Sequence, residues 1–137
     1  MENTIYHTKE LTFTVRPDNI IELATNATFK GAYSIESVEE NLRVLEKAIA
    51  GKKRATLLHF PEVYVKKEVL KEYANADLQT TASALLAKSF ASKLVGNLFL
   101  SLTGRFNAKL KDRPTKVFTD KEVAIDWLLE HLAKNKE

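Results

Sequence analysis

Two residues near the middle of the chain have the types and spacing that proton transfer requires. His59 and Glu62 lie close together in the sequence, and a histidine beside a carboxylate titrates close to neutral pH, where it can act as a general acid or base. The sequence around them supplies no nucleophile and no third group to orient the histidine. We therefore favour a simpler interpretation, in which a histidine at a strand end has its ring satisfied by the backbone, and we expect no enzymatic activity.

The remaining candidates for metal chemistry are few. His7 and His131 lie near the two ends of the sequence and have no metal-ligand spacing with His59. The chain contains no cysteine, which excludes disulfides, thiolate metal sites and cysteine nucleophiles. We predict no metal and no cofactor, and the lack of cysteine also suits an intracellular, cytoplasmic protein.

A second group of chemically useful residues consists of lysines in segments that follow predicted strands. In an open α/β sheet, ligands and partners meet the loops at the carboxyl ends of the strands, and helix N-termini at the same edge favour negative charge. Ordinary solvated lysines explain the pattern more simply, and we favour that explanation because lysines are mostly exposed in any protein and no Gly-rich cradle accompanies these. The full set of candidate binding residues is Lys30, His59, Glu62, Tyr64, Lys66, Lys67, Lys88 and Ser89.

Length and composition limit the classes of protein that the chain can form. Its 137 residues, 45% of them hydrophobic, suit a single domain over residues 1–137. The net charge of +3, from 21 basic and 18 acidic residues, is too small to require a nucleic-acid partner. No segment approaches the roughly 18 consecutive apolar residues of a membrane helix, so we predict no integral membrane segment.

The first half of the sequence predicts a hairpin, a helix and a buried strand. Apolar residues alternate over Leu11–Val15, and a Pro-Asp-Asn turn then precedes a second strand at Ile20–Leu23. An amphipathic helix follows, with Ser34 as the expected N-cap and Gly51 as the stop. The nearly continuous apolar run Ala55–Phe60 is typical of a strand buried on both faces.

The second half predicts alternating helices and strands. A helix is expected over Lys66–Ala74, a strand over Thr81–Ala87 and an apolar helix from Phe90 onward, which we expect to pack deep against the sheet. A polar loop at Gly104–Pro114 separates it from a short strand, Thr115–Phe118. Thr119 and Glu122 have capping-box spacing and are expected to open the last helix. The order ββαβαβαβα predicts an α/β fold with a mixed, mostly parallel sheet, in which the first predicted strand is antiparallel and lies at or near one edge.

This order resembles that of single-domain bacterial proteins with the STAS fold, the sulphate-transporter and anti-sigma-factor-antagonist domain, which are loosely grouped with the CRAL-TRIO lipid-binding fold. The segment from Phe118 to Leu128 and the stretch from Ala84 to Asn97 carry the resemblance, which covers nearly the whole chain. The resemblance implies a phosphorylatable serine after the third strand. No serine or threonine stands between Leu57 and Ala74, and His59 replaces the usual strand-end aspartate, so we expect no serine phosphoswitch of the usual kind.

Three functional hypotheses follow from the sequence. The first is a non-enzymatic STAS-like interaction module that docks a protein partner or a second copy of itself, with Tyr64 as an anchor and Lys66 and Lys67 as steering charges. The second is a carrier or sensor of a small anionic or lipid-like ligand, whose apolar part would lie against the helix that begins at Phe90. The third, which we favour least, is an enzyme that uses His59 and Glu62.

Overall fold

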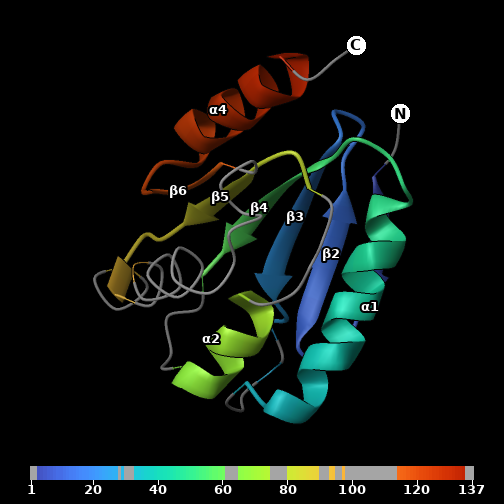
Figure 1. The fold of residues 1–137 in the computed structure, drawn as a ribbon, viewed down its shortest axis with the longest axis vertical. Helices are drawn as coiled ribbons and strands as arrows, with labels where there is room; N and C mark the ends of the chain where they lie inside the picture. The colour runs from blue at the N-terminus through green and yellow to red at the C-terminus, as the bar shows by residue number, and fades with distance from the viewer. Residues whose placement is uncertain are drawn as a thin grey trace.

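In the structure, a computed structural model, the described residues form a six-stranded sheet at the centre of the molecule (Figure 1). The structure describes residues 3–27, 29, 33–60, 65–74, 80–89, 93–94, 97 and 114–134. The strands lie side by side in sequence order, with antiparallel pairing from the first to the third and parallel pairing from the third to the sixth. They are β1 (Thr4–His7), β2 (Leu11–Val15), β3 (Ile20–Thr25), β4 (Ala55–His59), β5 (Ser83–Leu86) and β6 (Thr115–Phe118).

Helices cover both faces of this sheet. The 3₁₀ turn η1 (Ile35–Ser37), helix α1 (Val38–Ile49) and helix α2 (Lys67–Ala74) lie on one face, as right-handed crossovers require in a sheet of sequential order (Figure 1). Helix α4 (Lys121–Lys134) follows the last strand and packs on the opposite face, against β4, β5 and β6. Lys93, Leu94 and Asn97, between β5 and β6, are also helical.

Period-two alternation along the central strands divides the core into two layers. Ile20 and Ile21 are consecutive and both fully buried, because one side chain points to each face. Under α4 the layer contains Ile20, Leu57, Leu86, Ala124 and Leu128, among others. Under α1 it contains Phe13, Ile21, Leu23, Leu45 and Ile49, among others.

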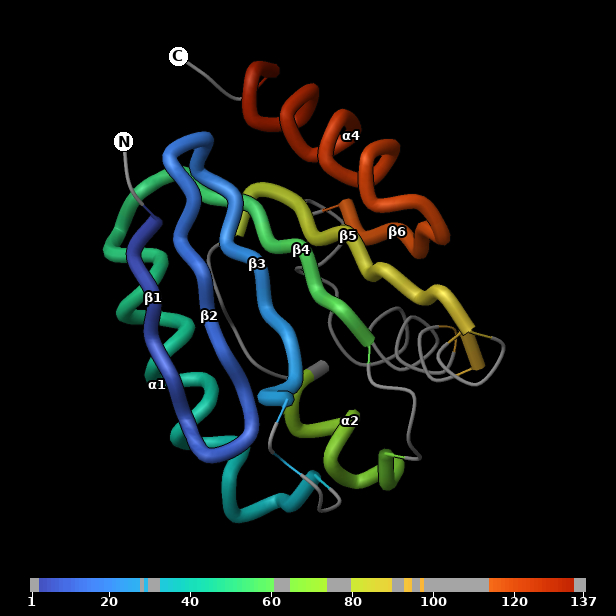
Figure 2. The backbone as a smooth tube through the Cα atoms, turned by 180° about the vertical axis from the view of Figure 1, so that it is seen from behind, coloured from blue at the N-terminus to red at the C-terminus, as the bar shows by residue number. Residues whose placement is uncertain are grey.

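Helix α4 leaves part of its face of the sheet uncovered. Seen from behind, no described helix lies over β1 and β2, while α1 is on their far side (Figure 2). The register places Ile5 beside Thr14, and Thr14 beside Glu22, on this side of the sheet. We call this surface the open face, made up of Ile5, His7, Thr12 and Thr14, with Glu22 at its border with α4.

The predicted α/β class and the mostly parallel mixed sheet are confirmed, and the arrangement is compatible with a STAS-like fold. The predicted hairpin and the later strands appear close to their expected positions, as do the helices α1, α2 and α4. Strand β1 was not predicted from the sequence, so the predicted order lacks one strand. Consequently β1 is the edge strand, and the hairpin strand β2 is its neighbour.

Two predicted helix caps are wrong in detail. Ser34 precedes η1, and its side chain donates to Ser37 Oγ at 2.9 Å instead of capping a backbone N–H. At α4 the cap is Asp120, one residue after the predicted Thr119, because its carboxylate accepts the backbone N–H groups of Glu122 and Val123. A carboxylate at this position also gains from the positive end of the helix dipole. Helix α1 is followed by Ala50 in the left-handed conformation with φ 54°, one residue before the predicted Gly51, which has φ 68°.

The apolar helix predicted from Phe90 lies mostly outside the described residues, as does the loop predicted over Gly104–Pro114 apart from Pro114. Leu94 is described and is 57% exposed. The expectation that this helix packs deep against the sheet is therefore wrong at Leu94.

Candidate functional site

The structure describes five of the eight candidate residues. Lys66, Lys67 and Lys88 are exposed, while His59 and Ser89 are partly buried. Lys66 and Lys67 lie at the start of α2, and Lys88 lies just after β5, so all three follow the carboxyl ends of parallel strands. We call these three residues the lysine rim. The other candidates, Lys30, Glu62 and Tyr64, lie outside the described residues.

His59 has a carboxylate partner that the sequence analysis did not identify. Its Nε2 lies 2.5 Å from Oε2 of Glu22 in the neighbouring strand β3. Glu22 pairs with Leu57 in the parallel register, and His59 is two residues further along β4, so both side chains point to the same face. The ring is therefore held by Glu22, where the sequence analysis expected the backbone or considered Glu62.

Glu22 is the centre of a larger ion cluster. Lys121, the first residue of α4, places Nζ 3.0 Å from Glu22 Oε2, and Arg16 lies 3.7 Å from Oε1. Arg16 also pairs with Asp18 at 2.9 Å. We call Arg16, Asp18, Glu22, His59 and Lys121 the Glu22 cluster.

The electrostatics of this cluster keep Glu22 ionised. The hydrogen bond from His59 is the main cause that lowers its pKa from 4.5 to about 2, and Lys121 contributes in the same direction against the desolvation of the carboxylate. A carboxylate with so low a pKa is a poor proton acceptor at neutral pH. Arg16 and Lys121 balance the charges of Asp18 and Glu22, so the geometry suits an electrostatic tie between α4 and β3.

A second polar cluster is buried at the opposite side of the sheet. Glu10 is only 2% exposed, and its carboxylate accepts the Asn41 amide at 2.9 Å and the backbone N–H of Ser34 at 3.1 Å. Asn41 also donates to the Tyr73 hydroxyl at 2.8 Å and accepts from Thr8 at 2.6 Å. We call these five residues the Glu10 cluster. It joins the β1–β2 turn to η1, α1 and α2.

Burial dominates the electrostatics of this second cluster. Desolvation raises the pKa of Tyr73 to about 12, so its hydroxyl stays protonated at ordinary pH. The partners of Glu10 come from segments 24 and 31 residues away. No local sequence pattern marks such a cluster, and the sequence analysis did not detect it.

The described residues place two further limits on the chemistry. Among them, no group of three or more His, Asp or Glu side chains is arranged to hold a metal ion. Within the same residues, no helix has the length and apolar character needed to cross a membrane.

The fold and these clusters define an α/β protein with a mixed sheet, a central ion cluster and an exposed lysine rim. The chain belongs to a protein family described as a domain of unknown function (DUF7793), which matches residues 11–132. That match begins at β2 and ends within α4, so β1 precedes it. No curated protein and no solved structure matches the chain.

Proposed function

We propose that the protein is a non-enzymatic interaction module with a STAS-like fold, which binds an acidic surface of a partner protein through the lysine rim. The observation that carries this proposal is that the three lysines of the rim are exposed and unpaired among the described residues. All are exposed, and none forms an ion pair with another described residue. By contrast, Arg16 and Lys121 are neutralised within the Glu22 cluster.

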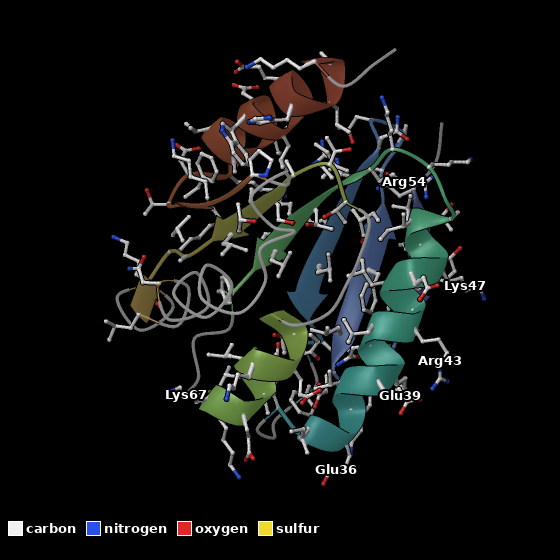
Figure 3. The ribbon with its side chains drawn as sticks, in the orientation of Figure 1. Glu36, Glu39, Arg43, Lys47, Arg54 and Lys67 are labelled. Atoms are coloured by element: carbon white, nitrogen blue, oxygen red, sulfur yellow. The ribbon has the colours of Figure 1, made fainter. Side chains whose placement is uncertain are left out.

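The base of the rim supports a role in recognition. Val65, Val69 and Leu70 are at most 4% exposed and pack in one apolar cluster with Tyr33 and Val38. This packing fixes the start of α2, so the charges of Lys66 and Lys67 project from a firmly held segment. Figure 3 shows Lys67 on α2, far from two other basic side chains, Lys47 and Arg54, which lie near the carboxyl end of α1. A partner that meets the rim loses little backbone entropy on binding.

The Glu22 cluster supports a non-enzymatic role. His59 already uses Nε2 in the contact with Glu22, and Lys121, the first residue of α4, pairs with the same carboxylate. The cluster is thus better suited to hold α4 in place than to transfer protons.

Other parts of the hypothesis depend on residues outside the described ranges. The anchoring role of Tyr64 and contacts from Lys30 and Glu62 stay predictions, as does the cytoplasmic location. The alternative of a carrier for an anionic or lipid-like ligand depends on residues 90–102, of which the structure describes Lys93, Leu94 and Asn97. It also stays a prediction.

The test uses charge reversal with a matched control. Lys66→Glu with Lys67→Glu changes the net charge from +3 to −1, because two positive charges become two negative ones. Lys52→Glu with Lys53→Glu is the matched control. It makes the same change in charge at two other consecutive, exposed lysines, which precede β4 and so lie at the amino ends of the parallel strands. Partners are captured by cross-linking from an extract of the source cells, and their association rates are measured with purified proteins.

We expect the rim variant to associate at least about tenfold more slowly, with a weaker salt dependence, because charges at an interface rim act mainly on the association rate. The Lys52 and Lys53 control should stay within about twofold of the wild type. Both variants should keep wild-type stability to within about 0.5 kcal/mol, as surface substitutions usually do. Equal rates for the two variants would contradict the proposal.

A further inference from the structure

The edge strand β1 has exposed side chains on both of its faces. Thr4, Ile5 and His7 are exposed, and Tyr6 is partly buried beneath α1. Ile5 retains 54% of its surface on the open face. An edge strand also presents a row of backbone groups that have no partner within the sheet.

The hydrogen-bond pattern identifies which backbone groups these are. The Thr8 N–H donates to Leu11 O at 2.9 Å, and these two residues are opposite each other in the β1–β2 register. Hydrogen-bonded pairs alternate with non-bonded pairs in an antiparallel ladder, so Thr4 and Tyr6 bond to β2 while Ile5 and His7 do not. The backbone N–H and C=O groups of Ile5 and His7 therefore point away from the sheet.

Natural edge strands usually carry protection against added strands, in the form of charged residues, proline, bulges or short length. The sequence Thr4–His7 has no charged residue and no proline. Its shortness is the remaining protection, and it limits an added strand to a few backbone bonds. The edge is thus open to a short extended segment.

The charges beside β1 indicate what that segment would contain. The Lys47 ammonium lies 5.4 Å from the centre of the Tyr6 ring, on the α1 side of the strand. Lys9 follows the strand and is exposed. Neither lysine forms an ion pair with a described residue, although Glu40 accepts the backbone N–H of Lys9 at 3.5 Å. Both lysines therefore carry a charge that no described acidic group pairs with, and Lys47 is the one that lies beside the strand, over Tyr6.

We propose that β1 binds an extended acidic segment of another protein by strand addition. An antiparallel segment would exchange both backbone hydrogen bonds with Ile5 and with His7. Its side chain opposite Ile5 would be apolar and would cover the exposed surface of Ile5. Its side chain opposite Tyr6 would be acidic and would pair with Lys47. This surface is separate from the lysine rim, and β1 lies outside the family match.

A second copy of the chain fits the same edge less well. Antiparallel self-pairing centred on Ile5 would satisfy the backbone groups, but it would bring a second Lys47 to the same side of the sheet. The two Tyr6 positions would then be about 8 Å apart, from the spacings of residues and strands in a sheet. An acidic segment neutralises Lys47, whereas a second copy adds like charge.

The test selects ligands from a display library of random extended peptides, using the full chain. Peptides are selected on the wild type and then measured on Ile5→Lys, which places a charge at the edge. Val123→Lys is the matched control, because Val123 is also 54% exposed but lies on α4. Lys47→Glu tests the charge preference, and Lys66→Glu with Lys67→Glu separates this surface from the rim.

We expect selected peptides that combine apolar and acidic residues, with binding at least about tenfold weaker in Ile5→Lys and unchanged in Val123→Lys. Lys47→Glu should shift the preference from acidic to basic peptides, and the rim variant should bind normally. Hydrogen exchange should slow at the amides of Ile5 and His7 when peptide is bound. A second variant, Ile5→Pro, should also abolish binding, because it removes the outward N–H that would bond to the peptide. The fold should tolerate this proline, since that N–H makes no bond within the sheet.

Three results would overturn the proposal. One is a selection in which no peptide depends on Ile5. Another is a set of peptides that protects amides elsewhere in the chain. The last is a concentration-dependent dimer, seen by analytical ultracentrifugation and lost in Ile5→Lys, which would assign the edge to a second copy.

Discussion

Replacing Glu22 with glutamine should lower the free energy of unfolding by about 1–2 kcal/mol at pH 7. The contacts of the carboxylate with His59 and Lys121 lower its pKa from 4.5 to about 2. A full difference of that size corresponds to about 3.4 kcal/mol. Because the Glu22 side chain is 20% exposed and solvent screens its ion pairs, only part of this free energy contributes to the stability of the folded protein.

The contribution of Glu22 to the free energy of unfolding depends on pH. The pKa of Glu22 is lower in the folded protein than in the unfolded chain, so its contribution is present above about pH 5 and is lost as the pH falls toward 2. Glutamine cannot titrate. The difference in stability between the wild type and Glu22→Gln should therefore shrink over this pH range.

Urea unfolding followed by the fluorescence of Trp127 measures both effects. Trp127 is the only tryptophan and lies in α4 against Phe118, with ring centres 5.3 Å apart, so its signal reports the packing of α4 on the sheet. Glu39→Gln is the matched control, since Glu39 forms an exposed pair with Arg43 in α1 and should contribute less than about 0.5 kcal/mol. Equal losses in the two variants, or a difference that does not change with pH, would refute the reasoning.

Two further substitutions test the packing. Glu10→Ala should cost about 2–4 kcal/mol, because it leaves one N–H of the buried Asn41 amide and the Ser34 N–H without an acceptor; a loss below about 1 kcal/mol in urea unfolding would contradict the Glu10 cluster. Leu128→Ala should cost about 3 kcal/mol, because Leu128 is fully buried between α4 and the sheet, whereas the neighbouring Leu129→Ala should cost less than about 1 kcal/mol. Thermal unfolding of this pair measures the difference, and similar values would mean that α4 does not pack as described.

Local patterns in the sequence predicted most of the elements, because they depend on neighbouring residues. Alternation gave β2 and β3, and apolar runs gave β4 and β5. The missed strand β1 has only four residues, which is too short for a clear alternating pattern of its own. Its pairing with β2, for example Tyr6 opposite Phe13, is what makes it a strand.

The side of the sheet that α4 covers could not be read from the sequence. Handedness rules constrain helices between parallel strands, and α4 follows the last strand. The crossover helices α1 and α2 lie on one face of the sheet. On the opposite face, Ile20, Leu57 and Leu86 would be exposed to water without a further helix. Helix α4 supplies that cover and brings Lys121 to Glu22.

The sequence by itself determined the α/β class, the positions of β2 to β6 and of α1, α2 and α4, and the exposure of Lys66, Lys67 and Lys88, since these follow from residue type and local spacing. Only the tertiary structure decided that His59 pairs with Glu22, 37 residues away, and that Glu10 is buried against Asn41. It also decided that β1 forms an open edge beside Lys47. These contacts depend on strand register and on how the layers pack, and neither quantity is a property of any single segment.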